Sequence, residues 1–193
     1  CFHKKAGDQH AEIVALTEAG AKARKATLYA NLEPCSHQGR TPPCTEAIIR
    51  AGISKVVIAT VDPNPLVSGR GIRILQEAGI KVKVGVLEDK ARRLNEIFFK
   101  FITTKKPFVM VKAAMSLDGK IATTTGKSRW ISGEKSRKFA HQLRAVSDGI
   151  MVGINTILQD DSQLTVRLDG EKVANPVRII VDSRGRLPLD RKV

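Results

Sequence analysis

The chain has 193 residues, a hydrophobic content of 42% and a formal net charge of +14. This hydrophobic content supports a packed core and excludes a wholly disordered chain, and no apolar run approaches the roughly 18 residues of a membrane-spanning helix. Because aromatic residues make up only 4% of the chain and the basic residues form no long block, the charge favours a phosphorylated small molecule over a nucleic acid as partner.

Helices and strands are predicted to alternate through the first part of the chain. The expected helices cover residues 10–25, 44–53, 71–80 and 88–104. The expected strands cover residues 26–35, 55–62 and 81–87. Thr45 is expected to cap the second helix and Gly52 to end it. This alternation predicts a parallel sheet with helices packed on it.

The sequence "KKP" at residues 105–107 predicts a domain boundary, with one domain over residues 1–106 and another over residues 107–193. In the second domain we expect a strand running into a turn over residues 108–120 and a helix over 132–147 that Ser132 caps. Two further strands, over 148–154 and 175–185, flank a short helical or irregular segment. No GxGxxG follows a strand, so a Rossmann site is not supported. Both ends of the chain are expected to be incomplete.

Two short stretches of the first domain predict a metal site. They are "HAE", with His10 and Glu12, and "PCSHQGRTPPC", which contains Cys35 and Cys44. One imidazole and two thiolates suit Zn²⁺, and a catalytic zinc keeps its fourth position for water. Glu12 is not needed as a ligand and is the expected proton carrier. The H-x-E and P-C elements match the signature of zinc deaminases, although the cysteines are spaced C-x8-C and not C-x2-C.

Less specific interpretations remain open for these residues. A lone histidine at a helix start is usually structural, and loop cysteines are often only small buried residues. A structural zinc would need a fourth protein ligand, for which His37 is the nearby candidate. Cys1, the third cysteine, is expected to play no part.

The motifs together resemble one known family. "HAE", "LEPCSHQGRTPPC" and "DPNPLVSGRGI" are similar to the deaminase part of the bifunctional riboflavin-biosynthesis deaminase–reductases, and "KAAMSLDGKIAT", "GKSRWISG" and "GINTILQDDSQLTVR" to the reductase part. The resemblance covers essentially the whole chain. It implies a cytidine-deaminase-like three-layer α/β/α domain followed by a partial dihydrofolate-reductase-like α/β domain. It also implies Zn²⁺ and NADPH as cofactors.

The implied reaction of the first domain is hydrolytic deamination of a diaminopyrimidinone ribosylamino phosphate. The resemblance implies that His10, Cys35 and Cys44 hold zinc and that Glu12 transfers the proton. Cationic or hydrogen-bonding groups beside the metal loop are expected to hold the substrate's phosphate; these are His3, His37 and Arg40. Asp62 and Asn64 follow a strand end, where parallel sheets place ligand groups, although plain turn chemistry explains them as well.

The implied reaction of the second domain is NADPH-dependent reduction of the ribosyl group to a ribityl chain. The resemblance implies the cofactor contacts Ala114, Trp130, Thr156, Asp160 and Ser183. It implies the substrate contacts Ser128, Arg144, Leu164 and Arg167, of which the two arginines suit a phosphate. Lys112, expected on a buried strand where its pKa would shift, and Asp160 are the candidates for proton handling.

Other interpretations of the second domain also stay open. Trp130 is as well explained by a core position, Asp160 and Asp161 by a solvated pair, and His141 by an exposed helix position.

Two other functions compete with this hypothesis. One is a zinc nucleoside or tRNA-base deaminase with an unrelated C-terminal domain, and the other is a zinc-stabilised RNA-binding module. We expect no membrane and no nucleic-acid partner, a homo-oligomer, and a cytoplasmic location.

Overall fold

The computed structural model describes residues 7–65, 67–168, 170 and 173–193. The chain divides into two compact units that meet between Val109 and Met110, and each unit is described by itself. Within the described residues, no helix combines the length and apolar character that crossing a bilayer requires.

The first unit is built on a three-stranded parallel sheet in the order β1-β2-β3. Its strands are β1 (Thr27–Ala30), β2 (Lys55–Ile58) and β3 (Lys81–Val84). Leu28 pairs with Val56, which in turn pairs with Val82. Side chains alternate between the two faces of a strand, so these apolar residues share one face of the sheet.

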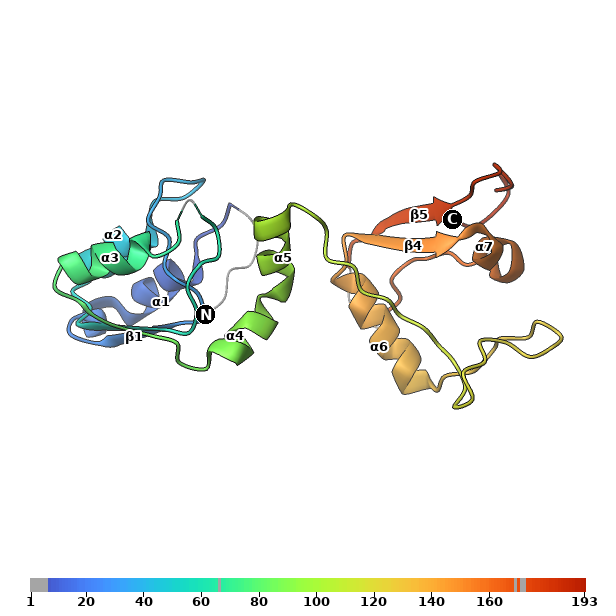
Figure 1. Ribbon diagram of the computed structural model, residues 1–193, viewed down its shortest axis with the longest axis horizontal. Coiled ribbons are helices and arrows are strands. Elements are labelled where there is room, and N and C mark those ends of the chain that lie inside the picture. The colour runs from blue at the N-terminus through green and yellow to red at the C-terminus, as the bar shows by residue number, and fades with distance from the viewer. Residues whose placement is uncertain (1–6, 66, 169, 171–172) are drawn as a thin grey trace. The chain divides into compact units, whose positions relative to one another are not determined.

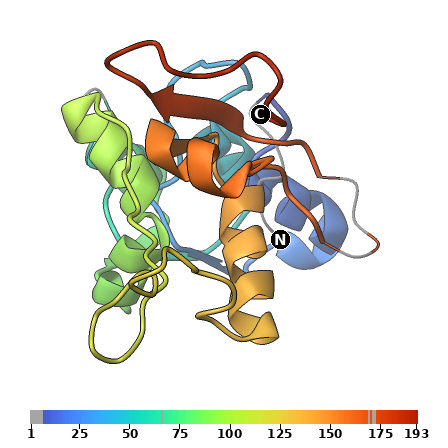
Figure 2. The ribbon, with the colours of Figure 1, turned by 90° about the vertical axis from the view of Figure 1, so that its right-hand side faces the viewer.

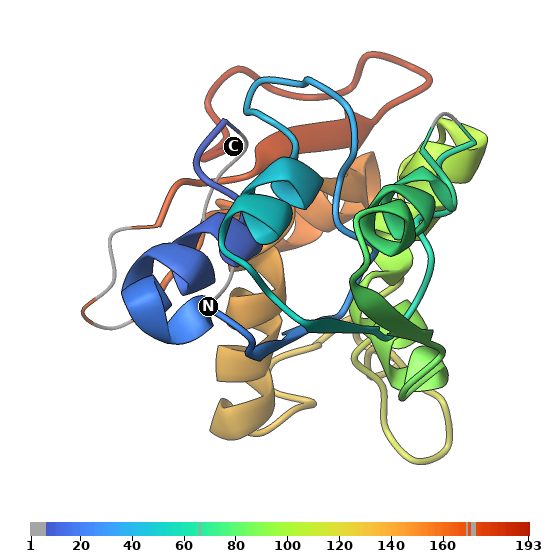
Figure 3. The same ribbon diagram turned by 90° about the vertical axis from the view of Figure 1, so that its left-hand side faces the viewer.

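Three α-helices cover that face. They are α1 (Ala11–Ala19, continued by a 3₁₀ turn over Gly20–Ala23), α2 (Cys44–Arg50) and α3 (Arg70–Glu77). Ile48 of α2 and Leu75 of α3 are fully buried against Val56 and Ile58. Figure 3 shows the three helices on one side of the strands. This apolar layer fixes the starts of α1 and α2, which carry the site residues.

The region expected as one helix over residues 88–104 forms two helices, α4 (Glu88–Leu94) and α5 (Glu96–Thr104). The break falls at Asn95, whose side-chain Nδ2 donates 2.9 Å to the carbonyl oxygen of Ala91. An asparagine side chain competes in this way with the backbone ladder. A cavity of about 300 Å³ lies between the strands and α4, lined by Tyr29, Val57 and Leu87 among others. Together with α1–α3 on the opposite face, α4 gives the expected α/β/α layering.

Two local predictions for this unit were wrong. The first strand was expected to reach residue 35 but ends at Ala30, because the chain then leaves the sheet and Glu33 bonds to Thr60 through its backbone N–H. Thr45 does not cap α2. The helix begins one residue earlier, and the backbone N–H of Thr45 donates to the carbonyl oxygen of Cys35.

The second unit contains a two-stranded parallel sheet of β4 (Gly149–Gly153) and β5 (Val177–Val181), with α6 (Glu134–Ala145) and α7 (Ile154–Asp160). Ile154, Ile157 and Leu164 form its buried core. Figures 1 and 2 show α7 beside this sheet, and its buried residues pack against Ile150 and Ile180. The predicted alternation of helices and strands is therefore confirmed from α6 to β5.

The segment before α6 differs from the prediction. Residues 107–114 form no strand; no described strand pairs with them, and a strand needs a neighbour to satisfy its backbone groups. The expected turn is present, with Gly119 donating to the carbonyl oxygen of Ser116. Ser132 is not the cap of α6. Gly133 holds that position, and the carbonyl oxygen of Ser132 accepts a hydrogen bond from Arg137.

Candidate metal centre and active site

Three side chains of the first unit converge on one point. His10 Nδ1 lies 3.5 Å from Cys35 Sγ and 3.2 Å from Cys44 Sγ. One ligand atom from each of these residues lies within 4.8 Å of the others. Their sequence separation of up to 34 residues is closed by the packing of α1 and α2 on the same sheet face.

The distances and the donor set fit zinc. A tetrahedral site with Zn–N of ~2.0 Å and Zn–S of ~2.3 Å places nitrogen and sulfur about 3.5 Å apart. The two observed N–S distances, 3.5 and 3.2 Å, agree with this separation. His37 does not belong to the group, so the described residues offer zinc three ligands and leave a fourth position open. An open fourth position is typical of catalytic zinc and not of structural zinc.

Two of the three ligands lie at helix starts, and the third lies in a loop. His10 is the residue at which α1 begins, and Cys44 is the first residue of α2. Cys35 lies in the segment after β1, where its sulfur accepts a hydrogen bond of 3.2 Å from the backbone N–H of Cys44. Pro43 directly before α2 fixes the backbone without leaving a donor unpaired. The C-x8-C loop therefore returns to its starting point and brings the two sulfurs together.

The two thiols titrate as a pair. The hydrogen bond from Cys44, helped by the Cys44 backbone N–H and His10 and opposed by burial, lowers the pKa of Cys35 to about 6. The same hydrogen bond to Cys35, together with burial and the nearby Glu12, raises the pKa of Cys44. Without a metal the pair thus holds one proton, and binding of zinc as two thiolates would release it.

Glu12 lies beside the ligands and is not one of the three residues grouped around the metal position. Its Oε2 is 3.8 Å from Cys44 Sγ. It stands in the first turn of α1, two residues after His10. A carboxylate at this distance can reach a water in the fourth position and exchange protons with it.

The outer nitrogen of His10 has a partner that sequence reasoning missed. Thr41 Oγ1 lies 3.4 Å from His10 Nε2. With Nδ1 as the metal ligand, the ring proton would lie on Nε2, which would donate to the Thr41 hydroxyl and fix the ring's orientation. Thr41 belongs to "GRTPPC", part of the loop between Cys35 and Cys44. A hydroxyl residue between two metal ligands is the sequence feature that could have indicated its role.

The structure shows local contacts for some of the expected substrate groups of the first unit. Asp62 and Asn64 form a tight turn, with the Asn64 N–H donating 2.8 Å to Asp62 Oδ1. Burial, with a contribution from Glu33, raises the pKa of Asp62, while the Asn64 N–H and His37 oppose the shift. His37 is therefore near Asp62. His3 lies outside the described residues.

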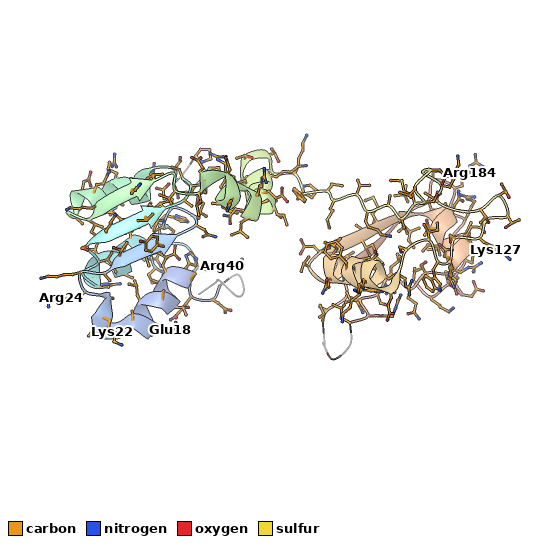
Figure 4. The ribbon with its side chains drawn as sticks, turned by 90° about the horizontal axis from the view of Figure 1, so that it is seen from below. Glu18, Lys22, Arg24, Arg40, Lys127 and Arg184 are labelled. Atoms are coloured by element: carbon orange, nitrogen blue, oxygen red, sulfur yellow. The ribbon has the colours of Figure 1, made fainter. Side chains whose placement is uncertain are left out.

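Arg40 is exposed. Figure 4 shows it by the N-terminal end of α1, the end that carries His10 and Glu12, whereas Glu18 and Lys22 lie toward the other end of that helix. An exposed guanidinium beside the metal loop is free to meet an anionic group of a ligand.

In the second unit, two of the expected substrate arginines come together. Arg144 Nη1 donates to the carbonyl oxygen of Thr165, and Arg167 Nη1 donates 3.2 Å to the Thr165 hydroxyl. Burial and the neighbouring Arg167 lower the pKa of Arg144. The buried Nε of Arg144 has no partner in the described structure. Two close cations with an unsatisfied buried donor favour an anionic ligand.

Leu164 is buried beside this pair, and His141 contributes to it. The backbone N–H of Arg167 donates 3.1 Å to His141 Nδ1. Burial, Arg144 and Arg167 lower the pKa of His141, which disfavours its protonated form. The interpretation of His141 as an exposed helix residue was therefore wrong. Ser128 is half-buried, and no contact places it beside the arginines.

Two of the expected cofactor residues lie on α7, and arginines close in sequence to two others contact this helix. Thr156 and Asp160 are four residues apart on this helix and so share a face. Arg129, next to Trp130, donates 3.0 Å to the carbonyl oxygen of Asp160. Arg186, near Ser183, donates 3.1 Å to Asn155 Oδ1. Ala114 lies apart in the extended segment.

Three alternatives or expectations for this unit need correction. Trp130 is 71% exposed, so a core position is wrong, and Arg137 lies over its ring at 4.4 Å. Asp161 is paired with Lys192 at 2.9 Å, so a freely solvated Asp160–Asp161 pair is also wrong. Lys112 was expected on a buried strand but is exposed, because that segment has no strand partner.

Comparisons with known proteins agree with this division of the chain. The family model "Cytidine and deoxycytidylate deaminase zinc-binding region" matches residues 2–60, and the model "RibD C-terminal domain" matches residues 107–193. The "Riboflavin biosynthesis protein RibD" of Aquifex aeolicus is 56% identical over all of this chain. The chain belongs to the RibD family.

Other family members give the same result. The RibD of Escherichia coli is 45% identical over the whole of this chain, and the match spans 56% of the length of the Escherichia coli protein. A solved structure of Acinetobacter baumannii RibD matches 98% of this chain at 49% identity, with a TM-score of 0.88, and is covered to 55%. The Thermotoga maritima structure, titled a diaminohydroxyphosphoribosylaminopyrimidine deaminase/5-amino-6-(5-phosphoribosylamino)uracil reductase, matches 95% at 46% identity, with a TM-score of 0.86, and is covered to 52%. The chain thus spans about half the length of the RibD proteins it matches. Membership confirms the cytidine-deaminase-like and reductase-like fold expectations.

Proposed function

We propose that the chain deaminates 2,5-diamino-6-(ribosylamino)pyrimidinone 5′-phosphate with zinc, and that its second unit takes part in the NADPH-dependent reduction of the product's ribosyl group to a ribityl chain. The observation that carries the proposal is the group of His10, Cys35 and Cys44 with Glu12 beside it and a fourth position open. The RibD membership of both parts of the chain selects riboflavin biosynthesis among the uses of such a site.

Glu12 would transfer protons in the deamination. Bound zinc supplies Lewis acidity that activates water near neutral pH. Water adds to the carbon that bears the amino group, and Glu12 takes up its proton on a carboxylate oxygen. Glu12 then passes this proton to the ring nitrogen that is double-bonded to the same carbon, and moves the remaining hydroxyl proton to the amino nitrogen, which leaves as ammonia as the C–N bond breaks and the ring carbonyl forms. One carboxylate near the open position suffices for both transfers.

The surrounding side chains would bind and orient the substrate. His37 and Arg40 offer positive charge or N–H donors for its phosphate. The turn of Asp62 and Asn64 offers side-chain and backbone groups that can hydrogen-bond the pyrimidine. The partial burial of Asp62 and Asn64 would strengthen these polar contacts, since water screens them less.

The second unit would hold the reductase substrate between Arg144, Arg167 and the buried Leu164. NADPH would contact four residues: the exposed Trp130, Thr156 and Ser183, and Asp160 at the end of α7. The nearby Arg129 and Arg186 suit its phosphates. NADPH supplies a hydride to the sugar carbon when bound. Asp160 and Lys112 remain candidates for moving protons during the ring opening. The roles of Ala114 and Ser128 remain predictions from the family resemblance.

The proposal is tested by ammonia release from the phosphorylated diaminopyrimidinone. The zinc-loaded chain should release ammonia from this compound and much more slowly from its dephosphorylated form, because the cationic groups have lost their ligand. Cytidine and an adenosine-containing tRNA serve as the comparison substrates. Turnover of either of these in preference to the phosphorylated pyrimidinone would contradict the proposal and favour a nucleoside or tRNA-base deaminase.

Replacing Arg167 with alanine is expected to weaken binding of the deaminated, phosphorylated product to the second unit. A lost charged hydrogen bond is worth about 1.5–3 kcal/mol, so the dissociation constant should rise about 10-fold or more. Titration calorimetry measures it, with Arg178→Ala, an exposed arginine on β5, as the matched control. Equal weakening by both variants would show a general charge effect and no defined phosphate site.

A homo-oligomeric state and a cytoplasmic location remain predictions. Light scattering of the zinc-loaded chain would test the first.

A further inference from the structure

Glu33 is a buried acidic residue that the proposed chemistry does not use. Its side chain is 5% exposed, and it lies two residues before the ligand Cys35. A buried carboxylate is costly unless hydrogen bonds replace its lost water. The groups that hydrogen-bond to the Glu33 carboxylate therefore indicate which part of the structure it stabilises.

Four backbone N–H groups donate to this one carboxylate. Oε2 accepts from Asp62 at 3.2 Å and from Gly69 at 3.0 Å. Oε1 accepts from Gly71 at 2.9 Å and from Ile72 at 3.3 Å. All four donors belong to one segment, which runs from the end of β2 into the first turn of α3. The carboxylate also stands at the N-terminal end of that helix, where negative charge is favoured.

Backbone contacts join the same two segments closely. The Glu33 N–H donates 3.0 Å to the carbonyl oxygen of Thr60, and Pro34 is fully buried. A Cβ atom at Gly71 would lie 2.2 Å from the carbonyl oxygen of Pro34 and 3.2 Å from Glu33 Oε1. Only glycine allows α3 to begin this close to the segment that leads to Cys35.

We propose that Glu33 is a positioning residue that holds the Asp62–Asn64 turn at a fixed place against the segment that leads to the ligand Cys35. Glu33 connects two segments of the protein. One segment carries Cys35, and the other carries Asp62 and leads into α3. The hydrogen bonds of the Glu33 side chain described above go to backbone N–H groups of residues 62–72 and not to the side chains of the metal ligands. Glu33 acts through the loop, so its removal should affect substrate binding more than the proton transfer. The expected change in KM rests on the proposed function. The expected change in the position of the turn rests on the hydrogen bonds alone.

Glutamine cannot replace Glu33. The amide has one oxygen, so its NH₂ group would face two of the four N–H donors and leave them unpaired. Each unpaired buried donor carries a desolvation penalty. Glu33→Gln keeps the side chain's size, and therefore separates hydrogen bonding from packing.

The first readout is amide hydrogen exchange of the full zinc-loaded chain. In Glu33→Gln the amides of residues 62–72 should exchange at least tenfold faster, while α1, α2 and β2 keep their protection and zinc stays at one per chain. Glu77→Gln, an exposed acid on α3, is the matched control and should change nothing. Unchanged exchange of residues 62–72 would overturn the proposal. A general loss of protection with loss of zinc would mean that this variant does not fold, and Gly71→Ala then decides the question.

The second readout is the split between KM and kcat in ammonia release. We expect KM for the phosphorylated pyrimidinone to rise at least tenfold in Glu33→Gln, with kcat per bound zinc within about threefold, because a misplaced turn weakens substrate binding. A fall in kcat with KM unchanged would overturn the proposal. Glu33→Asp, which keeps the charge but has a shorter reach, should give an intermediate KM.

Gly71→Ala separates the loop's position from the charge of Glu33. Its methyl group would push the start of α3 away from Pro34, so the exchange and KM should change in the same direction as in Glu33→Gln. It also keeps the test available if Glu33→Gln does not fold. If the wild-type chain releases no ammonia, the proposed function fails, and the exchange experiment still decides whether Glu33 holds the loop.

Discussion

Cys44→Ala is expected to remove zinc from the chain and abolish ammonia release. Cys44 is fully buried, and its sulfur is the ligand atom nearest to His10 Nδ1, at 3.2 Å. Two ligands cannot hold zinc in the arrangement of three, so zinc per chain should fall from one to about zero after dialysis, as metal analysis would show. Because zinc binds the folded chain, its loss should also lower the melting temperature of the first unit.

Cys1→Ala is the matched control for this experiment, since it removes the third cysteine of the sequence. It should retain one zinc and full ammonia release. A Cys44→Ala chain that keeps stoichiometric zinc, or one that turns over without zinc, would show that the metal lies elsewhere.

Glu12→Gln is expected to lower kcat for ammonia release by about 10³-fold while zinc stays at one per chain. General acid–base groups contribute about 10²–10⁴-fold, and the amide can neither accept nor deliver the proton. Glu12 lies 3.8 Å from Cys44 Sγ without belonging to the ligand group, so the metal should remain. KM should change little, because the amide keeps the side chain's shape.

Glu18→Gln on the same helix controls for a change in the helix charge and should leave kcat unchanged. Figure 4 shows Glu18 toward the opposite end of α1 from Arg40. A Glu12→Gln chain with kcat within tenfold of the wild type would exclude Glu12 as the proton carrier.

The metal group was predictable because its signal is local in sequence. His10 and Glu12 are fixed two residues apart by the start of a helix, and Cys35 and Cys44 stand at the ends of one loop. The geometry adds what spacing could not give: the N–S distances, the shared proton of the two thiols, and the exclusion of His37 from the ligand group. These depend on how α1 and α2 pack on the sheet.

Glu33 and Thr41 could not be predicted as functional from their neighbours in sequence. Glu33 acts on residues 29 to 39 positions away, and the sequence pattern contains no sign that four amides converge on it. The errors in the elements have the same origin. Residues 107–114 have a strand's apolar pattern without a strand partner, and the break at Asn95 arises from a side-chain hydrogen bond to the helix backbone.

The paired arginines of the second unit show an intermediate case. Their charge suggested a phosphate ligand, and the structure places both on Thr165. The role of His141 as acceptor for the Arg167 backbone N–H depends on a contact between α6 and a loop 26 residues further along the chain, which helical periodicity alone does not predict.

We expect deamination by this chain to require one zinc held by His10, Cys35 and Cys44. The most direct measurement is ammonia release from the phosphorylated diaminopyrimidinone during titration of the metal-free chain with zinc. The rate should rise in proportion to added zinc and stop rising at one zinc per chain. Stoichiometric zinc binding with no ammonia release, or ammonia release from the metal-free chain, would contradict this expectation.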